Sequence, residues 1–250
     1  MPSYRATAAL MLSLAALPLG AQDLPGTCHA TSSYDVTLNT DSVVFDRPSP
    51  APARVELQHG TLRADGAPVK LNAENQDRMV LFERDLRQLA PRVKTVAQNG
   101  VDMAVRAVQA EAGGLGLSAE TRVELDQRLH ARAGELKARI AASRSSHDWD
   151  GDATSQYANQ MASDLFPLIA GDLGQQAIDA ALGGDLQAAA TLRDRAASLT
   201  TEMQPRLLAR MQALRPQIQA LCPAIQQLAE LQQDVRGTQG QPLDLLQTGG

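Results

Sequence analysis

The sequence has few aromatic residues and, after residue 21, no long apolar run. Aromatic side chains make up 3% of the 250 residues, and six of them remain if residues 1–21 are removed. A core of Leu, Val, Met and Ala suits helix packing and does not favour a deep aromatic-lined pocket. No stretch beyond residue 21 is long and apolar enough to cross a bilayer, so we expect no transmembrane anchor after removal of that segment.

Motifs of common enzyme and metal sites are also missing. There is no GxSxG nucleophile elbow, no HExxH pair and no CxxC spacing. Ser146, His147 and Asp148 follow one another directly, and adjacent residues cannot converge as nucleophile, base and orienting acid. The histidines are scattered along the chain, as surface or capping residues are; they are His29, His59, His130 and His147. The sequence therefore predicts a protein that is not an enzyme and has no cofactor.

Basic residues are outnumbered, with 23 Lys and Arg against 28 Asp and Glu. A mildly acidic chain without a basic stripe is a poor candidate for nucleic acid, so we expect no nucleic-acid partner.

The first residues have the three parts of a secretory signal. Arg5 precedes an apolar run over residues 6–19, and Gly20 and Ala21 follow it. This run is too short to span a bilayer comfortably, and Ala21 suits the position before a cleavage site. We expect residues 1–21 to be a signal peptide cleaved after about Ala21 and the remainder to be exported, by this interpretation to the periplasm. An uncleaved anchor or a hydrophobic N-terminal helix is the alternative.

Only two cysteines are present, Cys28 and Cys222. In an oxidising compartment such a pair predicts a disulfide, which would join the N-terminal edge of the mature chain to its last helical segment. By the chain-entropy model, closing so long a loop contributes roughly 5 kcal/mol. Two free thiols remain the alternative.

Residues 22–71 are expected to form a small antiparallel β-meander of four or five strands. Apolar and polar residues alternate in pairs such as Val36 and Leu38 or Val55 and Leu57, which is the period of a half-buried strand. Asp65-Gly66 favours a tight hairpin because both central positions tolerate positive φ. The Pro-rich stretch 47–54 is a connector, because proline cannot lie in a central strand.

From residue 72 to about 236 the pattern becomes helical. Asn72 can cap a first helix, and apolar residues then recur in alternating steps of three and four, as in a heptad seam. This seam keeps its phase through Pro91 and Gly100, which favours one continuous, kinked helix. Its members are Met79, Phe82, Leu86, Leu89, Val93, Val96, Gly100, Met103, Ala107 and Ala110. The fold class expected is α+β: the meander followed by long, partly heptad-patterned helices packed as a bundle.

Three more helical segments are expected. They cover about 119–143, capped by Ser118, then 153–182, and finally 186–236, capped by Asp185. Pro205, Pro216 and Pro223 lie on one side of the last segment, which predicts a curved helix; three short helices that each start at a proline are the alternative. Residues 237–250, rich in Gly, Gln and Thr, are expected to be a flexible tail.

The stretch SSHDWDGDAT, residues 145–154, raises the question of a calcium loop. Asp148, Asp150 and Asp152 are spaced like the first three ligands of such a loop, but Ala153 and Asn159 stand where a glycine and a bidentate glutamate are needed. Tight calcium binding is therefore not expected, and these aspartates are only weak metal candidates. We favour a turn between two helices in which Asp152 caps the second one.

The segment LNAENQDRMVLFERDLRQLAP, residues 71–91, follows the hairpin that contains Asp65-Gly66. It resembles the start of the YggN-like family of exported proteobacterial proteins, a domain of unknown function. Cys28 and Cys222 also lie where that family has its two cysteines. The resemblance covers nearly the whole mature chain, and its specific part is residues 55–91. It implies a periplasmic location and supplies no catalytic residues.

Two functions remain open. The first is a non-enzymatic structural or protein-interaction module of the cell envelope, which binds an envelope protein or associates with itself. The alternative is a ligand-handling or chaperone-like module, in which the helices enclose an apolar groove for lipid or unfolded chains and methionines make that groove adaptable.

Overall fold

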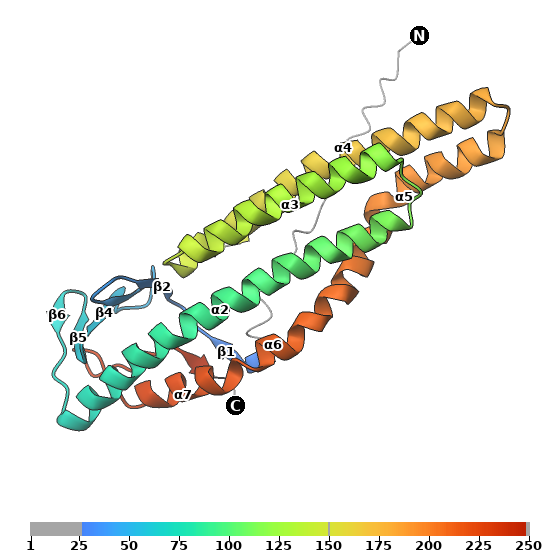
Figure 1. Cartoon of the computed structure of the whole chain (residues 1–250). Coiled ribbons are helices and arrows are strands. Elements are labelled where there is room, and N and C mark those ends of the chain that lie inside the picture. The colour runs from blue at the N-terminus through green and yellow to red at the C-terminus, as the bar shows by residue number, and fades with distance from the viewer. Residues whose placement is uncertain (1–26, 150, 249–250) are drawn as a thin grey trace, which may run out of the picture.

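The computed structural model describes residues 27–149 and 151–248, so the predicted signal segment 1–21 lies outside the described residues. An antiparallel sheet occupies one end of an elongated molecule, and helices run from it to the other end (Figure 1). The predicted α+β class is confirmed. None of the described helices combines the length and the apolar character needed to cross a membrane.

The main sheet has five antiparallel strands in sequence order. They are β2 (Asp35–Leu38), β3 (Val43–Asp46), β4 (Arg54–Gln58), β5 (Thr61–Ala64) and β6 (Ala67–Pro68). Ala64 pairs with Ala67 across a two-residue turn in which Asp65 and Gly66 have φ of 48° and 80°. The predicted tight hairpin at Asp65-Gly66 is thus confirmed.

A second, two-stranded sheet joins the two ends of the described chain. Strand β1 (Ala30–Thr31) pairs antiparallel with β7 (Gln247–Thr248). Leu243 and Leu245, which precede β7, are each 1% exposed in the core. The prediction of a flexible tail over residues 237–250 is therefore wrong for the described residues up to 248, because alternating leucines anchor this segment.

Helix α2 (Ala73–Gly113) contributes 41 residues and runs from beside the sheet along most of the molecule, ending short of its far end (Figure 1). At 1.5 Å per residue it is about 60 Å long. The Asn72 side chain accepts a hydrogen bond from the Asn75 N–H (2.7 Å), which confirms the predicted cap. The helix continues through Pro91 and Gly100, as the unbroken seam predicted. Pro91 is exposed, so water can satisfy the carbonyl that loses its partner.

Three further helices form an antiparallel succession beside α2. They are α3 (Ala119–Ala142), α4 (Gly151–Leu182) and α5 (Leu186–Met211), with the short 3-10 turn η1 (Ser146–Trp149) between α3 and α4. The predicted caps are present: Ser118 Oγ accepts from the Thr121 N–H (3.2 Å), and Asp185 Oδ1 accepts from the Ala188 N–H (2.9 Å). Helix α4 begins at Gly151, so Asp152 lies inside its first turn and the prediction that Asp152 precedes the helix as its cap is wrong.

The last helical segment is divided where two prolines stand. Helix α5 passes through Pro205, and it is followed by η2 (Gln212–Leu214), α6 (Arg215–Gln219) and α7 (Cys222–Gln232). Pro216 and Pro223 occupy the first turns of α6 and α7, where the missing N–H has no helical partner to lose. One curved helix over 186–236 is therefore wrong beyond Met211. The alternative of short helices starting at a proline holds for Pro216 and Pro223 but not for Pro205.

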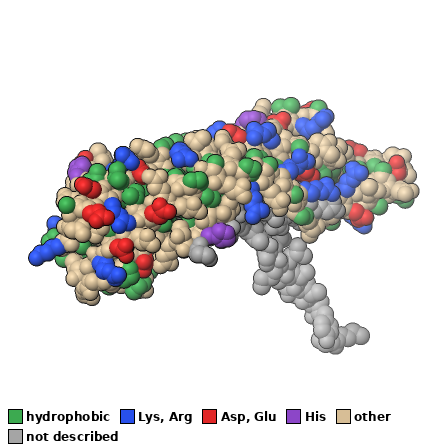
Figure 2. All heavy atoms as spheres, turned by 90° about the horizontal axis from the view of Figure 1, so that it is seen from below, with side chains coloured by type: hydrophobic (Ala, Val, Ile, Leu, Met, Phe, Trp, Pro, Cys, Tyr) green, Lys and Arg blue, Asp and Glu red, His purple; other side chains and the backbone are tan. Residues whose placement is uncertain are grey.

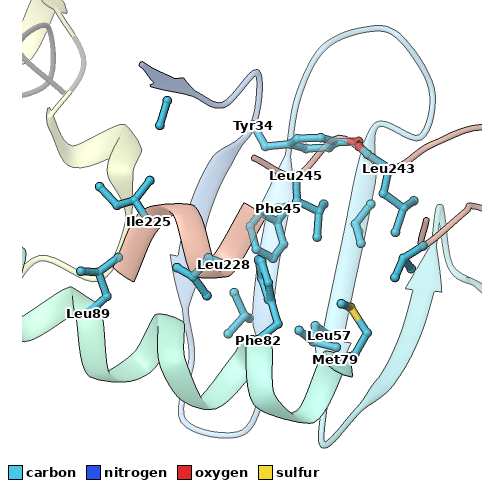
Figure 3. Packing of buried hydrophobic residues seen from close by; sticks show 14 of the residues in the cluster. Tyr34, Phe45, Leu57, Met79, Phe82, Leu89, Ile225, Leu228, Leu243 and Leu245 are labelled. Carbon is cyan, nitrogen blue, oxygen red and sulfur yellow. The ribbon is translucent and has the colours of Figure 1, made fainter. Parts of the chain in front are cut away.

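Buried side chains divide the molecule into two regions. The base consists of the two sheets, the first half of α2, α7 and residues 233–248, around one core cluster. Phe45 and Phe82 meet there with ring centroids 6.1 Å apart, between the sheet and α2 (Figure 3). The arm consists of the second half of α2 with α3, α4 and α5, around a second cluster that includes Leu129, Ile169 and Leu173. A small third cluster at η2 and α6 packs on α2 between them.

The predicted disulfide between Cys28 and Cys222 is present in the base. The two Cα atoms are 5.1 Å apart across a sequence separation of 194 residues. The bond fixes Cys28, two residues before β1, to the first residue of α7. The N-terminal end of the described chain is thus held to α7 by a covalent bond and to the C-terminal end by the β1–β7 pairing.

Basic side chains of α2 hold the ends of three other helices. Arg78 donates to the Glu230 carbonyl of α7, Arg92 to the Ala220 carbonyl after α6 (3.2 Å), and Lys94 to the Ala141 carbonyl of α3 (2.9 Å). The last carbonyls of a helix lack partners within it and carry partial negative charge, which cations stabilise. Helix α2 therefore acts as the spine that positions its neighbours.

Candidate functional site

Of the three aspartates proposed as weak metal candidates, only Asp148 has its side chain in the described part of the chain. Asp148 accepts hydrogen bonds from the Ser145 and Arg144 N–H groups (3.2 and 3.3 Å). The bond from Ser145, with others from Ser143 and Arg144, lowers the pKa of Asp148 despite partial burial. Asp150 lies outside the described residues, as does the side chain of Asp152. No group of three or more His, Cys, Asp or Glu residues in the described part of the chain could hold a metal ion.

Residues 144–146, at the start of the α3–α4 connection, attach the arm to the sheet. Ser146 Oγ accepts from the Val36 N–H (2.9 Å), and the Leu38 N–H donates to the Arg144 carbonyl (2.8 Å). Thr37 and Ser145 form an isolated antiparallel bridge. Strand β2 is an edge of the main sheet, and such an edge presents unpaired backbone groups. Residues 144–146 therefore cover the edge of β2 and lock the α3–α4 connection to it.

At the far end of the arm, α4 and α5 project beyond the other helices and join in a hairpin tip, residues 177–192 (Figure 1). Gln176 Nε2 donates to the Gly116 carbonyl in the α2–α3 turn (3.2 Å), and the hairpin runs on from there. Leu182 is six residues further along α4, which at 1.5 Å per residue is about 9 Å. The tip therefore stands clear of the α2–α3 turn.

Backbone hydrogen bonds stabilise the turn at the hairpin tip. The Asp185 N–H donates to the Ala180 carbonyl (2.9 Å) and the Gly184 N–H to the Ala181 carbonyl (3.1 Å). With Gly184 at a φ of 84°, these bonds form a Schellman motif that ends α4. Its exposed side chains are therefore displayed by a folded turn.

Three large aliphatic side chains are exposed on this hairpin tip. Ile178 is 55% exposed, Leu182 84% and Leu186 71%. Elsewhere in the described chain the exposed large hydrophobic residues are Val80, Leu81 and Val123, none above 57%. Single exposed hydrophobic residues are normal on a soluble protein, whereas a group of them marks a contact surface. The hairpin tip is therefore the candidate interaction site.

Charge also distinguishes this part of the chain. No Lys or Arg occurs from residue 145 to residue 192, a stretch that holds seven aspartates. Asp164 is paired with Arg132, and Asp172 accepts from the Ser118 N–H (3.0 Å) at the start of α3. Asp179 and Asp185 remain at the hairpin tip, and the next cation along α5 is Arg193. At the right-hand end of Figure 2, apolar, acidic and basic side chains lie close together.

Two surface hollows lack the lining that is typical of a site for an apolar ligand. One, of about 590 Å³, lies between Cys28, α7 and residues 233–248, and most of its lining is polar, with His29, Glu230 and Arg236 among it. The other, of about 340 Å³, lies between α2 and α5; Met103 and alanines line it with Arg106 and Arg210. Ligand pockets are commonly lined by hydrophobic and aromatic side chains. Neither lining has the aromatic surface that an apolar ligand favours.

Sequence reasoning placed a helix end at Gly183-Gly184 but did not single out the hairpin tip. Two signals were available there: Leu182 and Leu186 flank a turn, where polar residues are usual, and cations are missing from the whole of α4. What the pattern alone could not show is that α2 and α3 stop short of this turn and leave it uncovered.

The comparison with known protein families gives one match. The model of a family described as "Protein of unknown function (DUF2884)" matches residues 28–246, which is most of the chain. No curated protein and no solved structure matches the chain.

Proposed function

The chain belongs to the DUF2884 family of proteins of unknown function, and we propose that it is a non-enzymatic protein-interaction module of the cell envelope. In this proposal the disulfide-bonded base supports the arm, the arm holds the hairpin tip away from the base, and the hairpin tip is the surface that contacts a protein partner. The observation that carries it is the exposure of Ile178, Leu182 and Leu186 on a folded, projecting turn.

Export to the periplasm is part of the proposal. The signal-like segment 1–21, with Arg5 before its apolar run, supports it, as does the Cys28–Cys222 disulfide, because disulfides persist in oxidising compartments. The resemblance of residues 71–91 to the YggN-like family further supports a proteobacterial envelope protein. A non-enzymatic role is supported by the use of Ser145, Ser146 and Asp148 in structural hydrogen bonds.

A protein contact fits the tip better than a lipid groove does. Fully burying an exposed Leu or Ile contributes roughly 1.5–3 kcal/mol, so three side chains at one point supply a useful contact. A lipid groove, by contrast, needs a concave apolar lining, and the hollows described above are polar or lined by Met, Ala and Arg.

Site-specific photo-crosslinking in intact cells tests this function. A photoreactive residue replaces Leu182 in one variant and Val123 in a matched control, since Val123 is also apolar and 57% exposed but lies on α3. We expect a discrete protein adduct from position 182 and none from position 123. Absence of a protein adduct at 182, or equal adducts at both positions, would contradict the proposal. Fractionation of the same cells tests the periplasmic location.

A further inference from the structure

Resting on the proposed function, we propose that the partner of the hairpin tip is a second copy of this chain, whose own tip lies antiparallel against the first. Apolar and charged residues of the tip, with the residues that follow it on α5, form a pattern that is complementary to itself. A second copy would be the partner that the proposed function leaves open.

The apolar residues of the tip suit a contact with themselves. Ile178 and Leu182 are four residues apart on α4 and therefore share one face, and Leu186 starts α5 across the turn. A two-fold symmetric interface requires that the same patch be complementary to itself. Aliphatic side chains meet this requirement, because their contact is non-directional and needs no matching donor and acceptor.

The charges next to these residues are complementary only in one orientation. Asp179 and Asp185 lie at the end of the hairpin; Arg193 and Arg195 lie on α5 beyond it, on either side of Asp194, so this flank carries a net positive charge. Arg193 is eight residues past Asp185, which is about 12 Å along the helix. If two tips overlap antiparallel, the acidic end of each reaches the basic flank of the other, and the two-fold axis repeats this contact. Parallel tips would place acid against acid.

Other occupants fit the tip less well. Membrane surfaces that carry anionic lipids attract Lys and Arg, and residues 145–192 contain neither. Aromatic anchors typical of membrane interfaces are also missing from residues 167–192. Just beyond the tip, Arg193 and Asp194 lie 3.9 Å apart as an exposed ion pair, and at 81% and 76% exposure both side chains are accessible to a second copy.

The contact is small, so the dimer is expected to be weak and dependent on concentration. Interfaces below about 1,200 Å² are typical of transient association. Sedimentation velocity of the full, disulfide-bonded chain over roughly 1 to 300 µM covers the range in which such association is seen. We expect a shift from monomer to dimer within it. A wild-type chain that stays monomeric throughout overturns the inference.

Charge exchange between the two copies gives the sharpest test. Asp179→Arg places a cation against the partner's basic flank, and Arg193→Glu with Arg195→Glu places acid against the partner's acidic end. Each variant alone is expected to weaken the dimer by about tenfold or more, because the two-fold axis doubles a surface charge effect. An equimolar mixture of the two variants is expected to restore the dimer as a heterodimer. Homodimers of unchanged strength, or a mixture that stays monomeric, contradict the antiparallel tip contact.

Substitution of the apolar residues tests the same contact. Leu182→Gln with Leu186→Gln is expected to weaken the dimer at least as strongly as the charge variants, whereas Val123→Gln, the control, leaves it unchanged. The reverse result places the interface elsewhere and overturns the inference. Circular dichroism confirms that each variant is folded. A wild-type monomer whose position 182 still crosslinks to a different protein in cells overturns the second copy as partner and leaves the proposed function standing.

Discussion

The base and the arm differ in which parts of the sequence form their cores. In the base, strands, a helix and the C-terminal segment from distant parts of the sequence share one core that contains Tyr34, Phe45 and Phe82. In the arm, four helical segments pack through aliphatic side chains such as Leu129 and Leu173. The disulfide lies in the base, where it joins residues 194 positions apart in the sequence, while the arm extends the chain away from it (Figure 1). The exposed hairpin tip lies at the far end of the arm.

Tyr34 shows how tightly the base is joined. Its hydroxyl group lies 3.1 Å from the Leu243 carbonyl and 3.3 Å from the Pro52 carbonyl, and Arg47 stacks 4.0 Å from its ring centroid. Burial raises the pKa of Tyr34 although the nearby Arg47 lowers it. One side chain therefore connects the N-terminal segment, the Pro-rich connector and the C-terminal segment.

The largest difference between the regions is expected from Phe82→Ala. Phe82 is 1% exposed at the centre of the base, and removing such a ring costs about 3–5 kcal/mol of unfolding free energy. Denaturant unfolding measures the loss, and native-state hydrogen exchange shows whether the base opens before the arm. Leu173→Ala, at a position 0% exposed in the arm, is the matched control. If Phe82→Ala opens the arm first, the division into base and arm is wrong.

Removing the disulfide is a second way to compare the stability of the base with that of the arm. Cys28→Ser with Cys222→Ser is expected to lower the unfolding free energy by about 2–5 kcal/mol, because the unfolded chain regains the freedom that a long closed loop removes. Chemical reduction of the wild-type chain serves as the control for the substitutions. Exchange is expected to rise first at α7 and next to β1, which the bond joins, and at β7, which pairs with β1. A uniform rise over α3 and α4 would show that the bond stabilises the arm equally.

Local signals in the sequence predicted much of both regions. The caps at Asn72, Ser118 and Asp185 and the turn at Asp65-Gly66 follow from short-range hydrogen bonding and positive φ, which a few residues determine. The continuity of α2 followed from a seam that kept its phase through Pro91. The cysteine pairing followed from there being only two cysteines.

Non-local pairing was harder to predict. Leu243 and Leu245 alternate with Asp244, which is a strand period, but the Gly- and Gln-rich surroundings suggested a tail. Their burial depends on β1 and Tyr34, more than 200 residues earlier in the sequence. The pattern also left open whether the last segment is one curved helix or several; the structure divides it at Pro216 and Pro223 but not at Pro205. At the candidate site, the side-chain types were visible, whereas their exposure depends on where other helices end.

A smaller effect, confined to the arm, is expected from Asp172→Asn. Asp172 of α4 accepts from the Ser118 N–H and the Thr121 hydroxyl (both 3.0 Å) and so holds the start of α3. An amide has one oxygen acceptor in place of two, so a donor loses its partner, at a cost of about 1–3 kcal/mol. Thermal unfolding at neutral pH measures the loss. Thr121→Val removes one donor to Asp172 and the acceptor of the Ser118 hydroxyl but leaves the carboxylate and its bond from the Ser118 N–H in place, so it is expected to cost less.

The effect of Asp172 should also depend on pH. Burial raises the pKa of this carboxyl group, but hydrogen bonds from Ser118, Thr121 and Gln176 outweigh it, and the pKa is lowered from the ordinary value of 3.8. A carboxylate whose pKa is lower in the folded state stabilises that state fully above its ordinary pKa and loses this contribution as the pH falls through the folded value. The difference between wild type and Asp172→Asn should therefore be constant near pH 7 and shrink below pH 3.8. A difference that grows on acidification contradicts this role.

The smallest effect on stability is expected at the hairpin tip itself. Leu182 is 84% exposed, so Leu182→Gln removes little buried surface and should change the unfolding free energy by no more than about 0.5 kcal/mol. The neighbouring Schellman motif uses only backbone groups and Gly184, and both are unchanged by the substitution. Thermal unfolding below the concentration at which copies associate measures this term alone. A loss of more than about 1 kcal/mol would mean that Leu182 packs within its own chain, since that is the order of cost for buried side chains. Leu182 would then be part of the arm's core, and the distinction between a base with buried apolar residues and a tip with exposed ones would be wrong at Leu182.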